Sequence, residues 1–253
     1  MKRYNRYLLG LLASAAVVGF SSQASADRFD ISIENLSPNV LTPAVFVTHD
    51  ETADLFDAGS PASPQVERLA EEGIPNGLVG LATELQGSGQ VLDFGAATVD
   101  GGPIGPGQRA SLNLEADQDR ELLSYLSMLA FSNDAFIGAT TGDNAVELFR
   151  NGERFNGSFI VDDDAVWDAG TEVNDELEET VPGLGAAVDA GTPEGGVITA
   201  PHPGLTGEGD IPLSRNWTDG AVARISVNPA DGGNGGPAPV PEPATLLLVG
   251  VGL

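Results

Sequence analysis

The sequence predicts an all-β protein: an antiparallel β-sandwich with one or two short helices and long loops. Several short segments alternate apolar and polar residues, as half-buried strands do. Gly and Pro are frequent, with 33 and 17 residues, and many of them gather in turn sequences such as residues 101–103. Apolar residues at helical spacing are scarce. Short strands, frequent turns and little helix are together typical of an antiparallel sandwich.

The strands are expected in the following order. Residues 29–36 show the clearest alternation, and residues 44–48 form a β-rich run after Pro43. Val66, Leu69 and Ala70 share one helical face, which predicts a helix over residues 63–72 that ends at Gly73. Residues 141–150 stay ambiguous, and the Gly/Pro-rich residues 180–208 are expected to be irregular. The remaining predicted strands are residues 90–94, 110–114, 125–131, 155–161 and 221–227.

The N-terminus is predicted to be a secretory signal over residues 1–26. Lys2, Arg3 and Arg6 supply the positive start, residues 8–20 are apolar, and residues 24–26 fit the small-residue cleavage pattern. The apolar stretch is shorter than the ~20 residues that a membrane-spanning helix needs. We therefore expect an exported protein, with a single domain over residues 27–228. The sequence has no Cys, so no disulfide can brace this domain.

The C-terminus is predicted to carry a second targeting segment. Residues 229–239 are rich in Gly, Pro and Asn, as a flexible linker is. Residues 240–253 begin with Val240-Pro241-Glu242-Pro243 and continue with an apolar run. They resemble the PEP-CTERM sorting signal of Gram-negative bacteria, in a shortened form that lacks the usual basic cluster. The resemblance implies an exosortase-type processing enzyme as a partner, and a location outside the cell or on its outer surface.

Composition and motifs argue against two classes of function, nucleic-acid binding and catalysis by a Ser or Cys nucleophile. Asp and Glu number 37 against 11 Lys and Arg, a formal net charge of −26, and such a chain repels nucleic acid. There is no Gly-x-Ser-x-Gly motif and no Cys nucleophile. Of the two histidines, His49 is expected in a surface turn, and His202, between two prolines, is expected to have no chemical role. A pair of carboxylates for glycoside hydrolysis stays open, because their separation is invisible in a sequence.

Two acidic clusters lie in the middle of the chain, at residues 132–138 and 167–172. Each places carboxylates beside small or aromatic residues and follows an apolar run. Hard cations such as Ca²⁺ take several oxygen ligands from loops of this kind, whereas few His and no Cys leave little for a softer metal. Plain surface acids are the competing interpretation, and the run at residues 162–164 is interpreted as a solvated strand end. Trp167, with Phe131, Phe136 and Phe159, is expected in the core.

Several segments resemble the spondin N-terminal domain, a family of extracellular-matrix proteins and some exported bacterial proteins. Residues 132–138, Ser-Asn-Asp-Ala-Phe-Ile-Gly, are similar to its Ser-Pro-Asp-Trp-Phe-Val-Gly. Residues 167–172, Trp-Asp-Ala-Gly-Thr-Glu, are similar to its Trp-Asp-Ala-Gly-Thr-Asp. Residues 41–50, 55–59 and 69–73 add further matches, and the resemblance spans roughly residues 27–227.

The resemblance implies a β-sandwich with a C2-like layout and a bound Ca²⁺ ion. The family's ligand carboxylates correspond here to Asp134, Asp168 and Glu172, the last being one methylene longer than the family's Asp. Asp168 and Glu172 are four residues apart across Gly170, so a turn can bring both to one ion. The implied function is an exported calcium-binding recognition or adhesion module with an extracellular protein or glycan ligand. A secreted hydrolase with an acidic pair, or a purely structural envelope protein, is the alternative.

Overall fold

The computed structural model describes residues 26–87, 93–142 and 144–230. The predicted signal peptide, nearly all of the predicted linker and the predicted sorting segment lie outside the described residues. Within them, no helix is both long enough and apolar enough to cross a membrane. The interpretations of the two chain ends therefore stay predictions from the sequence.

Two antiparallel sheets form the body of the domain, as the alternating segments predicted. The strands of the first sheet are, in spatial order, β10 (Gly157–Asp162), β12 (Ala221–Pro229), β1 (Asp27–Asn35) and β4 (Arg109–Ala116). Those of the second are β11 (Val166–Asp168), β6 (Ala135–Ala139), β5 (Leu122–Met128), β2 (Ala44–His49) and β3 (Asp93–Ala97), with β7 (Val146–Glu147) also paired to β5. A small ribbon joins β8 (Phe149–Arg150) to β9 (Glu153–Arg154). The predicted β-sandwich is confirmed.

The first core lies between the two sheets. In β1 the alternation places Phe29, Ile31 and Ile33 inside with no exposed surface, while Asp30 on the opposite face is exposed. Burying each such side chain contributes about 1.5–3 kcal/mol. Phe46 of β2 and Tyr125 of β5 meet these residues from the second sheet. This core holds the two sheets together.

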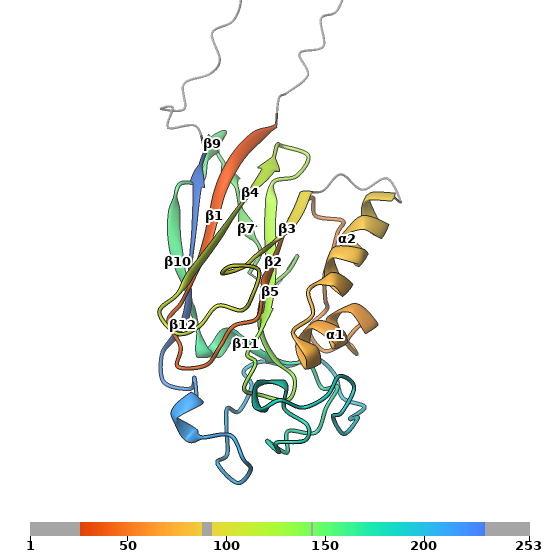
Figure 1. The fold of residues 1–253 in the computed structure, drawn as a ribbon. Coiled ribbons are helices and arrows are strands. Elements are labelled where there is room, and N and C mark those ends of the chain that lie inside the picture. Colours follow the sequence, from red (N-terminus) through yellow and green to blue (C-terminus); the bar gives the residue numbers. More distant parts are fainter. Residues whose placement is uncertain (1–25, 88–92, 143, 231–253) are drawn as a thin grey trace, which may run out of the picture.

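A second core lies on the other face of the second sheet, beneath two helices. These are α1 (Pro64–Glu72) and α2 (Asn76–Gly87), which run beside β2, β3 and β5 (Figure 1). Because both faces of the second sheet are covered, every residue of β2 is buried, whereas β1 also has exposed and half-buried residues. Phe56 packs edge-on against Phe136 and Trp167, with ring centroids 5.3 and 5.2 Å away. Phe136 and Trp167 are core residues as predicted.

The predicted helix is confirmed, and a second one follows it. Ser63 caps α1, its Oγ accepting from the amide of Val66 at 3.3 Å, and Gly73 ends it in the left-handed conformation. The sequence analysis missed α2 because Gly77 and Gly80 weaken its helical signal. Other short helical turns are η1 (Asp163–Ala165), η2 (Pro182–Leu184) and η3 (Leu213–Arg215). Residues 169–220 are otherwise irregular, which includes the predicted range 180–208.

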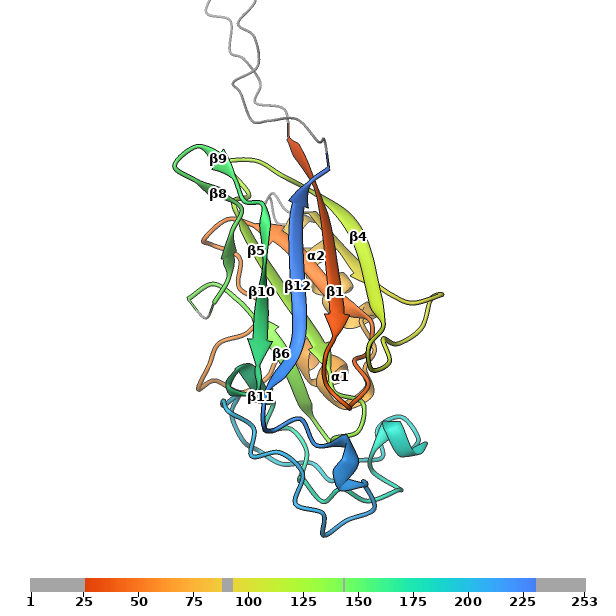
Figure 2. The same ribbon diagram turned by 90° about the vertical axis from the view of Figure 1, so that its left-hand side faces the viewer.

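The irregular residues gather at one end of the sandwich. Strands β1 and β12 pair over most of their length, with Phe29 opposite Pro229 at one end and Asn35 opposite Ala223 at the other. The start of β1 and the end of β12 thus lie side by side at the top of Figures 1 and 2. Residues 169–220 lie at the bottom of both views, which we call the loop end.

We predict that Gly73→Ala destabilises the domain more than Gly59→Ala does. Both glycines have positive φ, 63° and 80°, so Ala costs about 1–2 kcal/mol at each. At Gly73 the added Cβ would also come within 2.3 Å of Thr42 Cγ2, whereas nothing lies within 4 Å at Gly59. The clash adds about 1–3 kcal/mol. Urea unfolding measures both losses, and equal losses would contradict the packing described for α1.

Candidate cation site

A tight turn after β5 places Asp134. The Ser132 hydroxyl donates to the Leu129 carbonyl at 2.6 Å and accepts from the Ala135 amide at 3.1 Å, which closes the turn between β5 and β6. The prediction of a strand over residues 125–131 was therefore wrong by three residues at each end, since β5 spans Leu122–Met128 and the turn begins soon after. Asp134 lies in this turn with no exposed surface.

The Asp134 carboxylate joins this turn to the loop after β11. Its Oδ2 accepts the amides of Thr171 and Glu172 at 2.9 and 3.2 Å, and the Thr171 hydroxyl at 3.3 Å. Its Oδ1 is fully buried and has no hydrogen-bond partner among the residues that the structure describes. A buried carboxylate oxygen without a partner is costly. One side of Asp134 is thus satisfied by protein, and the other is free to accept a ligand.

Asp168 reaches the same place from the end of β11. Its backbone pairs with Ala135 of β6 on one side and with Thr199 on the other, which fixes its position. Its Oδ1 accepts the Gly170 amide at 2.8 Å, and its Oδ2 accepts the Asn174 side-chain amide at 3.0 Å. Gly170 has φ 67°, and a Cβ there would come within 2.7 Å of the Val197 amide nitrogen, so only glycine fits this turn.

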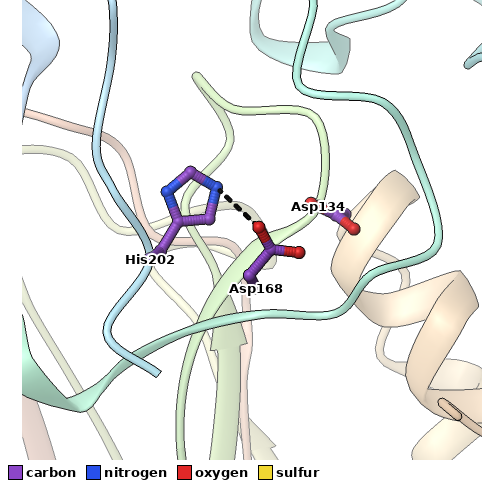
Figure 3. Close-up of side chains that lie close together, drawn as sticks. All are labelled: Asp134, Asp168 and His202. Atoms are coloured by element: carbon purple, nitrogen blue, oxygen red, sulfur yellow. Dashed lines mark ion pairs between the residues drawn. The ribbon is translucent and has the colours of Figure 1, made fainter. Parts of the chain in front are cut away.

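The third member of the group is His202. Ligand-type atoms of Asp134, Asp168 and His202 all lie within 4.8 Å of one another, and Figure 3 shows Asp168 with His202 on one side and Asp134 on the other. The sequence analysis expected no chemical role for His202. The structure instead brings it to Asp168, because the His202 amide bonds to the Val166 carbonyl of β11 at 2.8 Å. Nothing in the local sequence signals this pairing.

Glu172 lies beside this group without joining it. Its amide bonds to Asp134, but its carboxylate turns towards Gly191, where a Cβ would come within 1.4 Å of Glu172 Oε1. The residue is 4 % exposed, and its Oε2 has no partner within the described part of the chain. Of the three predicted ligands, the structure brings the carboxylates of Asp134 and Asp168 together and directs that of Glu172 elsewhere.

Negative charge is concentrated around these carboxylates. Burial raises the pKa of Glu172 to about 8, helped by the charges of Glu71, Asp134 and Glu72. Burial raises the pKa of Glu71 to about 7, and it raises the pKa of Asp134 to about 6, with the Asp168 charge as the next cause. Glu71 and Glu72 also end α1 without a basic residue in its last turn, where the helix dipole disfavours acids. A bound cation would relieve this repulsion.

Another buried carboxylate organises the loop end. Glu176 is 3 % exposed, and its two oxygens accept the amides of Thr206 and Gly207 at 2.5 and 3.2 Å. Its own amide donates to Asn133 Oδ1 at 3.0 Å, next to Asp134. Glu176 therefore ties residues 206–207 to the turn that carries Asp134.

The other polar groups singled out in the sequence lie apart from these contacts. His49 is fully buried, so the expectation of a surface turn was wrong. Its Nδ1 lies 2.7 Å from the Asp50 carbonyl, which can only accept, so its Nε2 accepts from the Ser124 hydroxyl at 2.7 Å. Ser124 has no exposed surface, so the pair is structural rather than a nucleophile and base. In the acidic run, Asp162 and Asp164 are exposed, as expected of a solvated strand end.

Comparison with known proteins identifies the family. The family model described as Spondin_N matches residues 4–179, well over half of the chain. The chain belongs to the spondin N-terminal domain family. The matched part of this spondin domain includes Asp134, Asp168 and Glu172 and ends before His202. No curated protein matched the chain. Spondin-like domains are typically extracellular, and theirs is not an enzyme family.

We predict that the spondin domain loses stability as pH rises in the absence of divalent cations. Carboxyl groups whose pKa is raised by folding contribute stability below their ordinary pKa, and this is lost as pH rises through the folded value. Burial lowers the pKa of His49 and His202. Below the ordinary histidine pKa near 6.5, these two groups therefore make stability rise with pH. Above about pH 6.5 only the acidic effect remains, from Glu71 and Glu172.

The measurement is urea unfolding in EDTA between about pH 6.5 and 8.5, the window set by those pKa values. Glu172→Gln, which is neutral throughout, is expected to flatten the dependence. Stability that stays constant or rises across this window in the wild-type protein would contradict the described environment of Glu172.

We also predict that Glu176→Gln destabilises the domain by about 1–3 kcal/mol. The glutamine amide can offer one acceptor oxygen, so its NH₂ group would face a backbone amide of Thr206 or Gly207. Glu179→Gln, the same change at an exposed position, is the control and is expected to have little effect. Equal unfolding midpoints for the two variants would show that Glu176 does not hold the loop end.

Proposed function

We propose that this chain is an exported, calcium-binding recognition module that uses its loop end to bind an extracellular protein or glycan. The observation that carries the proposal is Asp134 Oδ1, a fully buried acceptor without a partner among the described residues, beside a second carboxylate, Asp168. Oxygen atoms from separate loops are the ligands that Ca²⁺ prefers. Asp134 and Asp168 would hold the ion, and Glu172 is the further carboxylate available in the same loop.

The ion's contribution would be to fix the loop end. Asp134 belongs to the turn between β5 and β6, and Asp168 is the last residue of β11, directly before the irregular segment, so one ion would join the rigid and irregular parts. An ion that binds only the folded state stabilises that state, and here it would stabilise the loop end. The loop end also has exposed side chains that could contact a partner. Its exposed large apolar residues are Val173, Val188, Val197 and Leu213.

Burial disfavours the alternative of a secreted hydrolase. A glycosidase needs both carboxyl groups of its pair in contact with the substrate. Asp134 has no exposed surface, and one of its oxygens already accepts three hydrogen bonds. The family assignment agrees, since spondin N-terminal domains are not enzymes. Export and processing by an exosortase-type enzyme rest on residues outside the described part and stay predictions.

We predict that Ca²⁺ raises the thermal unfolding midpoint and that Asp134→Asn or Asp168→Asn removes the effect. With a Kd of about 10⁻⁴–10⁻³ M, as in many extracellular modules, about 10 mM Ca²⁺ adds roughly 1.4–2.7 kcal/mol. For a domain of this size that is a rise of roughly 3–11 °C. Calorimetric scans with Ca²⁺ and with EDTA measure it, and metal analysis of the native protein is the companion measurement.

The matched control is Asp164→Asn, which removes one charge from an exposed carboxylate outside the site and should leave the rise intact. In EDTA near neutral pH, Asp134→Asn is not expected to lower the unfolding midpoint, because the asparagine side chain carries no charge and so removes the buried negative charge of Asp134. An unchanged wild-type midpoint, with no calcium in the purified protein, would exclude the proposal.

A further inference from the structure

The ring of His202 is held in one orientation beside the candidate site. It is 4 % exposed and packs against Trp217, with ring centroids 5.3 Å apart. Its Nδ1 lies 3.0 Å from the amide nitrogen of Gly204. Gly204 has φ 85°, and a Cβ there would come within 2.3 Å of Thr218 Cγ2, so this backbone conformation belongs to glycine. The amide of Gly204 is therefore fixed against the ring.

This contact decides which ring nitrogen carries the proton. A backbone N–H can only donate, so Nδ1 must accept with its lone pair. A neutral imidazole has one such nitrogen, and the other bears hydrogen. Nε2, which faces the site, is therefore an N–H group with no lone pair to offer a metal.

The remaining contacts agree with this assignment. His202 Nε2 lies 3.2 Å from Asn174 Oδ1 and 3.8 Å from Asp168 Oδ2, and both oxygens accept. Asn174 in turn donates its Nδ2 to the same Asp168 oxygen at 3.0 Å. Donors thus follow one another from Gly204 through His202 and Asn174 to Asp168, and each acceptor meets a donor.

We propose that His202 is a positioning and selectivity residue, which orients Asp168 through Asn174 and withholds its own nitrogen, so that the site offers only oxygen and selects a hard cation. This inference rests on the proposed function. Zn²⁺ and related metals favour sites in which a neutral imidazole supplies a lone pair. Binding such a metal at Nε2 would move the proton to Nδ1, where it would face the Gly204 N–H across 3.0 Å. Two opposed donors are repulsive, which disfavours that arrangement.

The first test is NMR of the ¹⁵N-labelled full chain, which reports the protonation of each ring nitrogen directly. In EDTA, we expect His202 to show a protonated Nε2 and an unprotonated Nδ1, and to keep that pattern when Ca²⁺ or Zn²⁺ is added. His49, with the opposite tautomer, is an internal reference. Loss of the His202 Nε2 proton on addition of Zn²⁺ would overturn the inference in favour of a carboxylate and imidazole site for a transition metal.

The second test is calorimetric titration with Ca²⁺. Removing a residue that orients a metal ligand typically weakens affinity by about 10–100-fold, and we expect this of His202→Phe and of Asn174→Ala. Because both act through one chain of hydrogen bonds, the double variant should lose little more than either single one. His202→Gln, whose amide can donate in place of Nε2, should restore most of the affinity, which a loss of packing alone would not allow.

The outcomes separate the two proposals. Wild-type protein that fails to bind Ca²⁺ overturns the proposed function and this inference with it. Wild-type protein that binds Ca²⁺, with His202→Phe binding equally well, overturns the inference alone. The His202→Phe variant keeps an aromatic ring against Trp217 and is expected to fold. Urea unfolding of the metal-free variant checks that it does.

Discussion

The loop end of this domain depends on one buried carboxylate. Asp134 has no contact with solvent, yet it accepts backbone amides from a segment almost forty positions later, at Thr171 and Glu172. A carboxylate can be held in such a place only where donors or a cation balance it. Hydrogen-bond donors balance Oδ2 of Asp134. Its Oδ1 has no donor among the described residues, and this is why we regard Asp134 as part of a candidate binding site and not only as a structural contact.

The surrounding architecture makes that arrangement possible. On one side, β5, β6 and β11 form part of a sheet buried on both faces, with Phe136 and Trp167 packed beneath the helices. On the other side, residues 169–220 have almost no regular structure. Their shape comes from acceptors placed inside, Asp134 and Glu176, which take backbone amides that a sheet would otherwise satisfy. With no Cys in the chain, these buried acids do the bracing that disulfides do in many exported domains.

How much could be predicted from the sequence follows from the range of each interaction. The alternation in β1 and the end of α1 at Gly73 are local features, and both were predicted correctly. The family resemblance of the two acidic clusters also implied that Asp134 and Asp168 lie close together. The side-chain direction of Glu172 could not be predicted, because it depends on the space at Gly191, nor could the position of His202, which pairing with Val166 decides. His49 looked like a turn residue because its cover comes from strands distant in sequence.

The pairing of β1 with β12 has a consequence for how the domain can be presented. The chain enters the domain at the start of β1 and leaves it at the end of β12, and these two strand ends lie side by side at the end of the sandwich opposite the loop end. A tether on either terminus would therefore hold the domain by the opposite end, and the loop end with its candidate cation site would point away from the anchoring surface. Fusion partners, labels or further domains attached to either terminus would likewise leave the loop end accessible.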